Sequence, residues 1–197
     1  MKYYRAILSV IILTCFQTAI WTQLNAQEHM KFMKVPIDGT ITEFASKMKA
    51  KGFIQDYVEE DAVVMEGSFM GRSCRIYILG SPKTKTVYTV VVNIEKKYTS
   101  WYSIKNAYNE IVDSYIGKYG VPAKKLNFFN SPYYEGDGYE LQAIRMDKCN
   151  YVSKWEEEDG IILVYITKST QITISYNDRL NGEKKEAEEQ SQINEDI

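Results

Sequence analysis

Residues 100–122 read SWYSIKNAYNEIVDSYIGKYGVP, and their apolar side chains recur at every third or fourth position. That spacing predicts an α-helix with one apolar side and one polar side. Ser100 is expected to cap the helix, because its hydroxyl can accept a hydrogen bond from a first-turn amide that has no helical partner. Gly120 and Pro122 are expected to end it. The predicted apolar face consists of Trp101, Ile104, Tyr108, Ile111, Val112, Tyr115 and Tyr119.

Runs of β-branched and aromatic residues on both sides of this helix predict strands on which it can lie. The expected strands are residues 62–66, 73–79 and 86–95 before the helix, and 139–146, 151–157, 161–167 and 171–176 after it. The pair Asp159-Gly160 predicts a hairpin with a type I′ turn, because glycine adopts positive φ freely. Residues 123–138 are rich in proline, glycine and aromatic residues and are expected to form a long loop.

A second, shorter helix is expected over residues 41–51, where Thr40 and Glu43 form a capping box and Gly52 ends the helix. The order of elements predicts an α+β protein in which helices pack on an antiparallel sheet. The order also suggests a single domain over residues 27–182 with two related halves, 36–99 and 100–182. Residues 183–197 have almost no apolar side chains, and they predict a charged tail that is frayed helix or disordered.

The first 26 residues have the pattern of a signal peptide, with a basic start, an apolar run and a small residue, Ala26, at the expected cleavage point. We expect cleavage and a periplasmic or secreted protein. The two alternatives are an uncleaved membrane anchor and a lipid-modified Cys15. The apolar run is shorter than the roughly 20 residues that a bilayer span needs, which disfavours the uncleaved anchor. No membrane span is expected after cleavage.

Cleavage would remove two basic residues and no acidic ones, which changes the net charge from −2 to −4. A mildly acidic chain is a poor match for a phosphate backbone, so no nucleic-acid partner is expected. The sequence shows no cofactor motif, and no cofactor is expected. Two cysteines would remain, Cys74 and Cys149. They either form a disulfide, as exported proteins favour, or serve as small buried apolar side chains.

The sequence shows no motif that pairs a nucleophile with a base or groups metal ligands, so we expect a binding protein and assign no catalytic residue. His29 is the only histidine, and a serine or cysteine nucleophile usually needs a histidine base. The alternative is a small envelope-associated hydrolase that uses carboxylates or a metal. Glu135, Asp137 and Glu140 are the carboxylates that would be considered for a hard cation, because they lie close together in the sequence.

The chain contains 16 tyrosines, and those of the predicted loop follow neither helical nor strand periodicity. Phe128 and Phe129 are expected to pack into the core and so hold the loop against it. Tyr133, Tyr134 and Tyr139 are expected to contact the ligand, because an exposed tyrosine offers a rigid apolar surface with a polar tip. The expected partner is an extracytoplasmic protein or glycan. A structural accessory of the cell envelope is the remaining alternative.

Several turn and cap motifs resemble those of a family of exported proteins of Bacteroides-type bacteria. The resemblance covers residues 30–182 and implies a fold and an exported location, without any catalytic residue. The two helix-and-strand halves are also similar in topology to the β-lactamase-inhibitor-protein class and to small outer-membrane assembly lipoproteins. The motifs are Pro36-Ile37-Asp38-Gly39-Thr40, Lys51-Gly52-Phe53, Gly67-x-Phe69-x-Gly71, Lys118-Tyr119-Gly120-Val121-Pro122 and Tyr176-x-Asp178.

Overall fold

A computed structural model describes residues 28–196, so the predicted signal peptide, its cleavage site and Cys15 lie outside the described residues. The described chain is an α+β protein with one large antiparallel sheet and four helices. In chain order its elements are β1 (Lys31–Phe32), β2 (Val35–Pro36), α2 (Ile41–Lys49), β3 (Ile54–Val58), β4 (Ala62–Phe69), β5 (Arg72–Gly80), β6 (Val87–Ile94), α3 (Trp101–Tyr119), β7 (Lys124–Phe129), α4 (Glu140–Arg145), β8 (Cys149–Glu157), β9 (Gly160–Ile166), β10 (Ile172–Asp178) and α5 (Arg179–Asp196).

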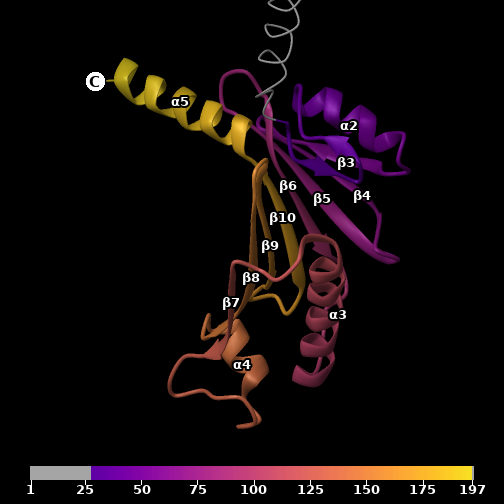
Figure 1. Ribbon diagram of the computed structural model, residues 1–197, viewed down its shortest axis with the longest axis vertical. Helices are drawn as coiled ribbons and strands as arrows, with labels where there is room; N and C mark the ends of the chain where they lie inside the picture. Colours follow the sequence, from indigo (N-terminus) through magenta and orange to yellow (C-terminus); the bar gives the residue numbers. More distant parts are fainter. Residues whose placement is uncertain (1–27, 197) are drawn as a thin grey trace, which may run out of the picture.

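Eight strands form a single continuous sheet in the order β3-β4-β5-β6-β10-β9-β8-β7, while β1 and β2 form a separate hairpin. Strands β6 and β10 pair at the centre of the sheet, where Val92 lies opposite Ile174. A helix followed by four strands therefore occurs twice, as α2 with β3–β6 and as α3 with β7–β10, and the last strands of the two sets meet (Figure 1).

Helix α3 has the caps and the buried face that its sequence predicts. The hydroxyl of Ser100 accepts a hydrogen bond from the amide of Ser103 at 3.2 Å, and Gly120 forms the C-cap with positive φ. Helix α2 also begins as predicted, because Thr40 and Glu43 form both bonds of the capping box. The buried side chains of the two helices are Ile41, Phe44, Ala45, Met48, Ile104, Ala107, Tyr108, Ile111, Val112 and Tyr115.

One core fills the space between these helices and one face of the sheet. Figure 1 shows α2 and α3 on the same side of the sheet, with α5 extending from its upper end. The hydroxyls of Tyr108 and Ser153 are hydrogen-bonded at 2.7 Å, which ties α3 to β8. Phe32 of β1 packs edge-on against Tyr176 of β10 at 5.2 Å between ring centroids, so the β1–β2 hairpin joins the same core.

The other face of the sheet is partly exposed to solvent. Burial alternates between buried and half-buried side chains along β5, β8 and β9, which is the pattern of an antiparallel sheet with one covered face. The central strands place Thr89, Thr173 and Ser175 on this second face, opposite Asn177, Asn93 and Val91 respectively. All three side chains are buried, so this second face is closed over its two central strands and more open along β5, β8 and β9.

Three predicted segments differ in the structure. Strand β3 was absent from the prediction because all five of its residues are exposed on the sheet edge and show no alternation. Residues 123–138 are not one long loop, since β7 occupies their first part as the opposite edge. Residues 139–146 were predicted as a strand and instead contain α4, in which the adjacent residues Ala143 and Ile144 are both buried. Adjacent buried side chains fit a helix face and not one face of a strand.

The hairpin between β8 and β9 is confirmed, but its type I′ turn is wrong. Its turn residues are Glu158 and Asp159, and neither has positive φ. Gly160 begins β9, where an added Cβ would lie 2.1 Å from the carbonyl oxygen of Asn177, so glycine serves a close approach between strands. Turns with positive φ at both central residues occur instead at Met33-Lys34 and Met70-Gly71.

The charged tail is a helix that docks on the body of the protein. Of the two readings of residues 183–197, helix is the one that the structure supports up to Asp196. The carboxylate of Glu188 accepts hydrogen bonds from the amides of Lys83 and Thr84 at 2.9 and 3.2 Å. These bonds hold α5 against the turn between β5 and β6.

Both cysteines of the described chain are free thiols. Cys74 lies on β5 and is buried, and Cys149 begins β8 and is half-buried. The structure therefore corrects the disulfide interpretation. Burial raises the pKa of both thiols, to about 11 for Cys74 and about 12 for Cys149, which keeps them protonated and unreactive at neutral pH.

Candidate functional site

The segment 130–139, between β7 and α4, lies at the lower end of the molecule beside the first turn of α3 (Figure 1). We call it the aromatic loop. Glu135 fixes it to the body of the protein, because its carboxylate accepts from Trp101 Nε1 at 3.2 Å and from the Tyr151 hydroxyl at 3.1 Å. Lys105 forms an ion pair with the same carboxylate. The hydrogen bond from Lys105 lowers the pKa of Glu135, so this anchor is ionised at neutral pH.

A second carboxylate sets the shape of the loop itself. Asp137 Oδ2 accepts from the amide of Tyr134 at 3.0 Å, and Asp137 Oδ1 accepts from the amide of Tyr139 at 2.7 Å. Glu140 Oε1 accepts from the amide of Gly136 at 2.8 Å. Asp137 thus holds the backbone on both sides of it, at two of the three tyrosines that the sequence singles out.

The three predicted ligand-contacting tyrosines are not equivalent. Tyr134 and Tyr139 are 65% and 61% exposed. Tyr133 is half-buried instead, and its hydroxyl donates to the sulfur of Met146 at 3.1 Å and accepts from Gln142 Nε2 at 3.2 Å. Tyr133 therefore packs the loop against α4, and Tyr134 and Tyr139 are the two that a partner can reach.

The pair of phenylalanines on β7 is divided between core and surface. Phe129 packs against the core as expected, and its ring centroid lies 5.1 Å from that of Trp101 and 5.9 Å from that of Tyr151. Phe128 does not, and 45% of it is exposed. The reason is the strand itself, because consecutive side chains on β7 point to opposite faces of the sheet.

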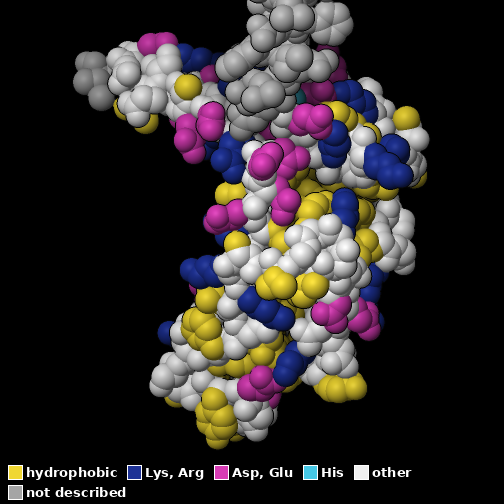
Figure 2. Space-filling view, viewed as in Figure 1, with side chains coloured by type: hydrophobic (Ala, Val, Ile, Leu, Met, Phe, Trp, Pro, Cys, Tyr) yellow, Lys and Arg dark blue, Asp and Glu magenta, His cyan; other side chains and the backbone are white. Residues whose placement is uncertain are grey.

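Sequence reasoning missed two further exposed side chains at this end. Tyr102 follows the cap of α3 and is 76% exposed, and Met146, at the C-cap of α4, is 54% exposed. Figure 2 shows hydrophobic side chains on the surface at this lower end of the molecule. Tyr102 could have been found, because it lies outside the apolar stripe of α3.

The three carboxylates considered for a cation are two from the aromatic loop, Glu135 and Asp137, and one from the start of α4, Glu140. Glu135, Asp137 and Glu140 are each engaged with amide, indole, hydroxyl or ammonium donors. Among residues 28–196 no group of three acidic, histidine or cysteine side chains is arranged to hold a metal ion. In the structure these three carboxylates hold the loop through hydrogen bonds and an ion pair.

The single histidine forms a structural contact. His29 Nδ1 lies 3.0 and 3.1 Å from the two carboxylate oxygens of Asp178. The same buried carboxylate accepts from the amides of Met30 and Asn181, both at 2.8 Å, and so links the start of the described chain to the first turn of α5. Within residues 28–196 no serine hydroxyl or cysteine thiol is hydrogen-bonded to His29.

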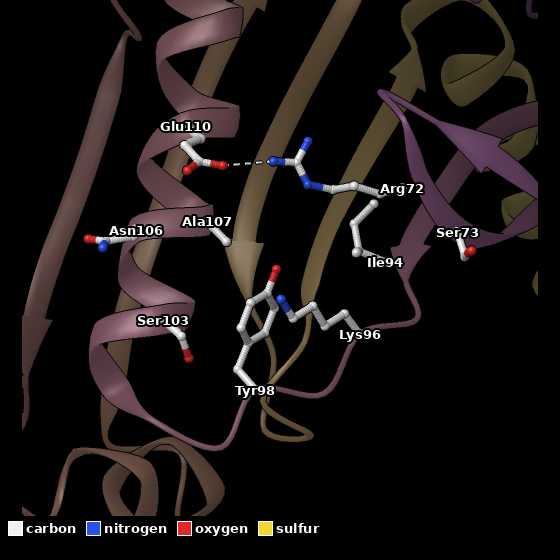
Figure 3. Close-up of a pocket in the computed structure, with 9 residues that line it drawn as sticks. All are labelled: Arg72, Ser73, Ile94, Lys96, Tyr98, Ser103, Asn106, Ala107 and Glu110. Carbon is white, nitrogen blue, oxygen red and sulfur yellow. Dashed lines mark hydrogen bonds and ion pairs between the residues drawn. The ribbon is translucent and has the colours of Figure 1, made fainter.

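A hollow of about 480 Å³ lies between α3 and the ends of β5 and β6 (Figure 3). Arg72 reaches across it and pairs with Glu110 of α3 at 2.9 Å. Below this pair lies Tyr98, whose phenol pKa is raised by burial, with Lys96 Nζ 5.0 Å from the ring centroid. Glu110 is the one carboxylate among the lining residues, so this hollow does not offer the carboxylate pair of a glycoside hydrolase.

Carboxyl groups with a shifted pKa all shift in one direction. The pKa is lowered by ion pairs and hydrogen bonds at Glu28, Glu43, Glu135, Glu156, Glu188 and Glu195. A carboxylic acid that donates a proton in catalysis needs the opposite shift. The ion pairs and hydrogen bonds of these six carboxylates stabilise the folded chain.

Comparison of the chain with protein-family models, curated proteins and solved structures finds no match. In residues 28–196, no helix combines the length and the apolar composition that crossing a membrane requires.

Proposed function

We propose that this chain acts outside the cytoplasm as a binding protein whose aromatic loop contacts a protein partner through Tyr134 and Tyr139. The observation that carries the proposal is the pair of hydrogen bonds from the Tyr134 and Tyr139 amides to Asp137. A loop that is already fixed loses little conformational entropy on binding. Two large apolar side chains held in solvent on such a loop have no stabilising role in the free protein.

A protein is favoured over a glycan because the exposed apolar side chains at this end come from several elements. Tyr102 lies on α3, Phe128 on β7 and Met146 at the end of α4, in addition to the two loop tyrosines. Tyrosine, phenylalanine and methionine are enriched in the cores of protein–protein interfaces. An extended set of this kind suits a broad partner surface, whether that partner is transient or a structural component of the envelope.

The test is site-specific photocrosslinking on the chain from Gln27 to Ile197, which includes every residue that the structure describes. A photoreactive phenylalanine replaces Tyr134 or Tyr139 and is irradiated in envelope extract. We expect a discrete adduct at both positions, whose added mass glycosidases leave intact and whose tryptic digest contains peptides that are foreign to this chain. Tyr57 is the matched control, because it is an exposed tyrosine on the distant edge strand β3.

The double variant Tyr134→Ser, Tyr139→Ser should also lose most of the adduct formed from a probe at Tyr102, while Tyr57→Ser should retain it. An adduct whose added mass is removed by glycosidase, leaving the chain at its own mass, would identify a glycan partner instead. Equal labelling from Tyr57 and Tyr134 would contradict a binding role for the loop.

A further inference from the structure

A second hollow, of about 300 Å³, lies at the opposite end of α3 from the aromatic loop. Three segments that are distant in sequence form its walls: the β1–β2 turn, the β4–β5 turn and the last turns of α3. We call it the hairpin pocket. Its volume is at the small end of the roughly 300–1,000 Å³ that ligand sites span.

The interior of the hairpin pocket is apolar and aromatic. Tyr115 and Tyr176 are both buried, and their hydroxyls are hydrogen-bonded to each other, so neither needs a polar partner from a ligand. Burial raises the pKa of both phenols, which keeps them neutral. Met33 and Met70 supply further apolar wall, and methionine adapts its shape to what it packs against.

The residues around this interior carry positive charge only. Lys31, Lys34 and Lys118 line the pocket, and no acidic side chain does, although the whole chain has a net negative charge. Lys31 pairs with the exposed Glu28 at 2.7 Å, and Lys118 donates to the Tyr119 hydroxyl at 2.6 Å. Lys34 forms no ion pair with any residue of the described chain. An anionic group would complement these lysines.

Unusual backbone conformations gather at the same place. Six non-glycine residues of the described chain have positive φ, and three of them line the hairpin pocket: Met33 at 49°, Lys34 at 67° and Met70 at 52°. Two-residue hairpin turns of type I′ require positive φ at both central residues, and a turn of this kind leaves its side chains little freedom to move. The two tight turns therefore hold Met33, Lys34 and Met70 in place around the pocket.

We propose that the hairpin pocket binds a small amphipathic carboxylate, with an alkyl body against Met33, Met70 and Tyr115 and its carboxylate among the lysines. The apolar interior offers no partner for a polyhydroxylated sugar, and the lysines repel an amphipathic cation. This site is separate from the aromatic loop and does not depend on the proposed function.

The test uses the chain from Gln27 to Ile197 with ¹³C-labelled methionine methyl groups, titrated with octanoate, octanol and octylamine below their micelle concentrations. We expect saturable shifts of the Met33 and Met70 signals with octanoate. Octanol should bind at least about tenfold more weakly and octylamine should not bind, because the lysines contribute only to an anion. Met146, exposed at the other end of the molecule, is the internal reference.

Lys34→Gln and Lys118→Gln should each weaken octanoate binding by about threefold to fivefold, the usual effect of one partly exposed charge contact. Lys49→Gln, on the exposed side of α2, is the matched control and should bind as the unchanged chain does. Equal affinity for octanol and octanoate, unsaturable shifts, or shifts of Met146 in place of Met33 and Met70 would each overturn the proposal.

Discussion

Asp137 is the residue on which the shape of the aromatic loop depends. Each of its two carboxylate oxygens receives one backbone amide, from Tyr134 and from Tyr139. In Asp137→Ala both amides lose their acceptor. Because the loop is at the surface, water can replace the lost bonds, and the free energy of unfolding should fall by only about 1 kcal/mol. Local order should change far more than global stability.

We therefore expect amide hydrogen exchange at Tyr134 and Tyr139 to accelerate at least about tenfold in Asp137→Ala, measured residue by residue with NMR. Asp137→Asn keeps one carbonyl oxygen and should protect one of the two amides. Asp113→Ala, an exposed change on α3, is the control. Unchanged exchange at both tyrosines would mean that Glu135 and Glu140 hold the loop without Asp137.

At the scale of whole elements, the docking of α5 depends on the ionisation of Glu188. Partial burial acts to raise the pKa of this carboxyl, but hydrogen bonds from the Thr84 hydroxyl and the Lys83 amide outweigh it and lower the pKa to about 2. A pKa lowered in the folded state stabilises the fold above the ordinary value of 4.5. That contribution is lost as the pH falls from 4.5 toward 2.

Glu188→Gln should reduce the free energy of unfolding by about 1 kcal/mol at pH 7, because the amide keeps an acceptor and loses the charge. The difference from the unchanged chain should stay constant down to about pH 5 and shrink at lower pH. Urea unfolding at pH 7, 5, 4 and 3 measures it, with Glu183→Gln on the same helix as control. A difference that is as large at pH 3 as at pH 7 would contradict this role.

The elements that could be predicted from the sequence are those with local signals. The cap residues Ser100 and Thr40 bond to amides only three residues further along the chain, so each cap can be recognised from a short stretch of sequence. The buried face of a helix can also be recognised locally, because its apolar residues repeat every 3.6 positions. The edge strands β3 and β7 lack such a signal. All of β3 is exposed, and the two half-buried residues of β7, Leu126 and Phe129, are three positions apart, which is not a period-two pattern.

In the aromatic loop too, features with a local sequence signal could be predicted and contacts between distant residues could not. Exposure of Tyr134 could be predicted, because proline and glycine around it exclude regular structure. The contact of Glu135 with Trp101 could not, because it joins residues 34 positions apart. Only the packing of α3 beside the loop brings these two side chains together.

At the scale of the whole molecule, the two helix-and-strand sets share one core. Phe44 of α2 and Ile111 of α3 are both fully buried in the same hydrophobic cluster. The pairing of β6 with β10 joins the two sets through five residue pairs in the middle of the sheet. Because residues of both sets belong to one buried cluster, the chain should unfold as one unit.

We expect calorimetry of the chain from Gln27 to Ile197 to show one transition with equal calorimetric and van't Hoff enthalpies. Phe44→Ala should lower the free energy of unfolding by about 3–5 kcal/mol and Ile111→Ala by about 2–5 kcal/mol, because each leaves a cavity in the shared core. Both variants should shift the same transition. The exposed changes Thr42→Ala on α2 and Asn106→Ala on α3 should stay within about 0.5 kcal/mol of the unchanged chain. Two transitions, of which Phe44→Ala moves only one, would show that the sets fold independently and that the β6–β10 pairing is a contact between two domains.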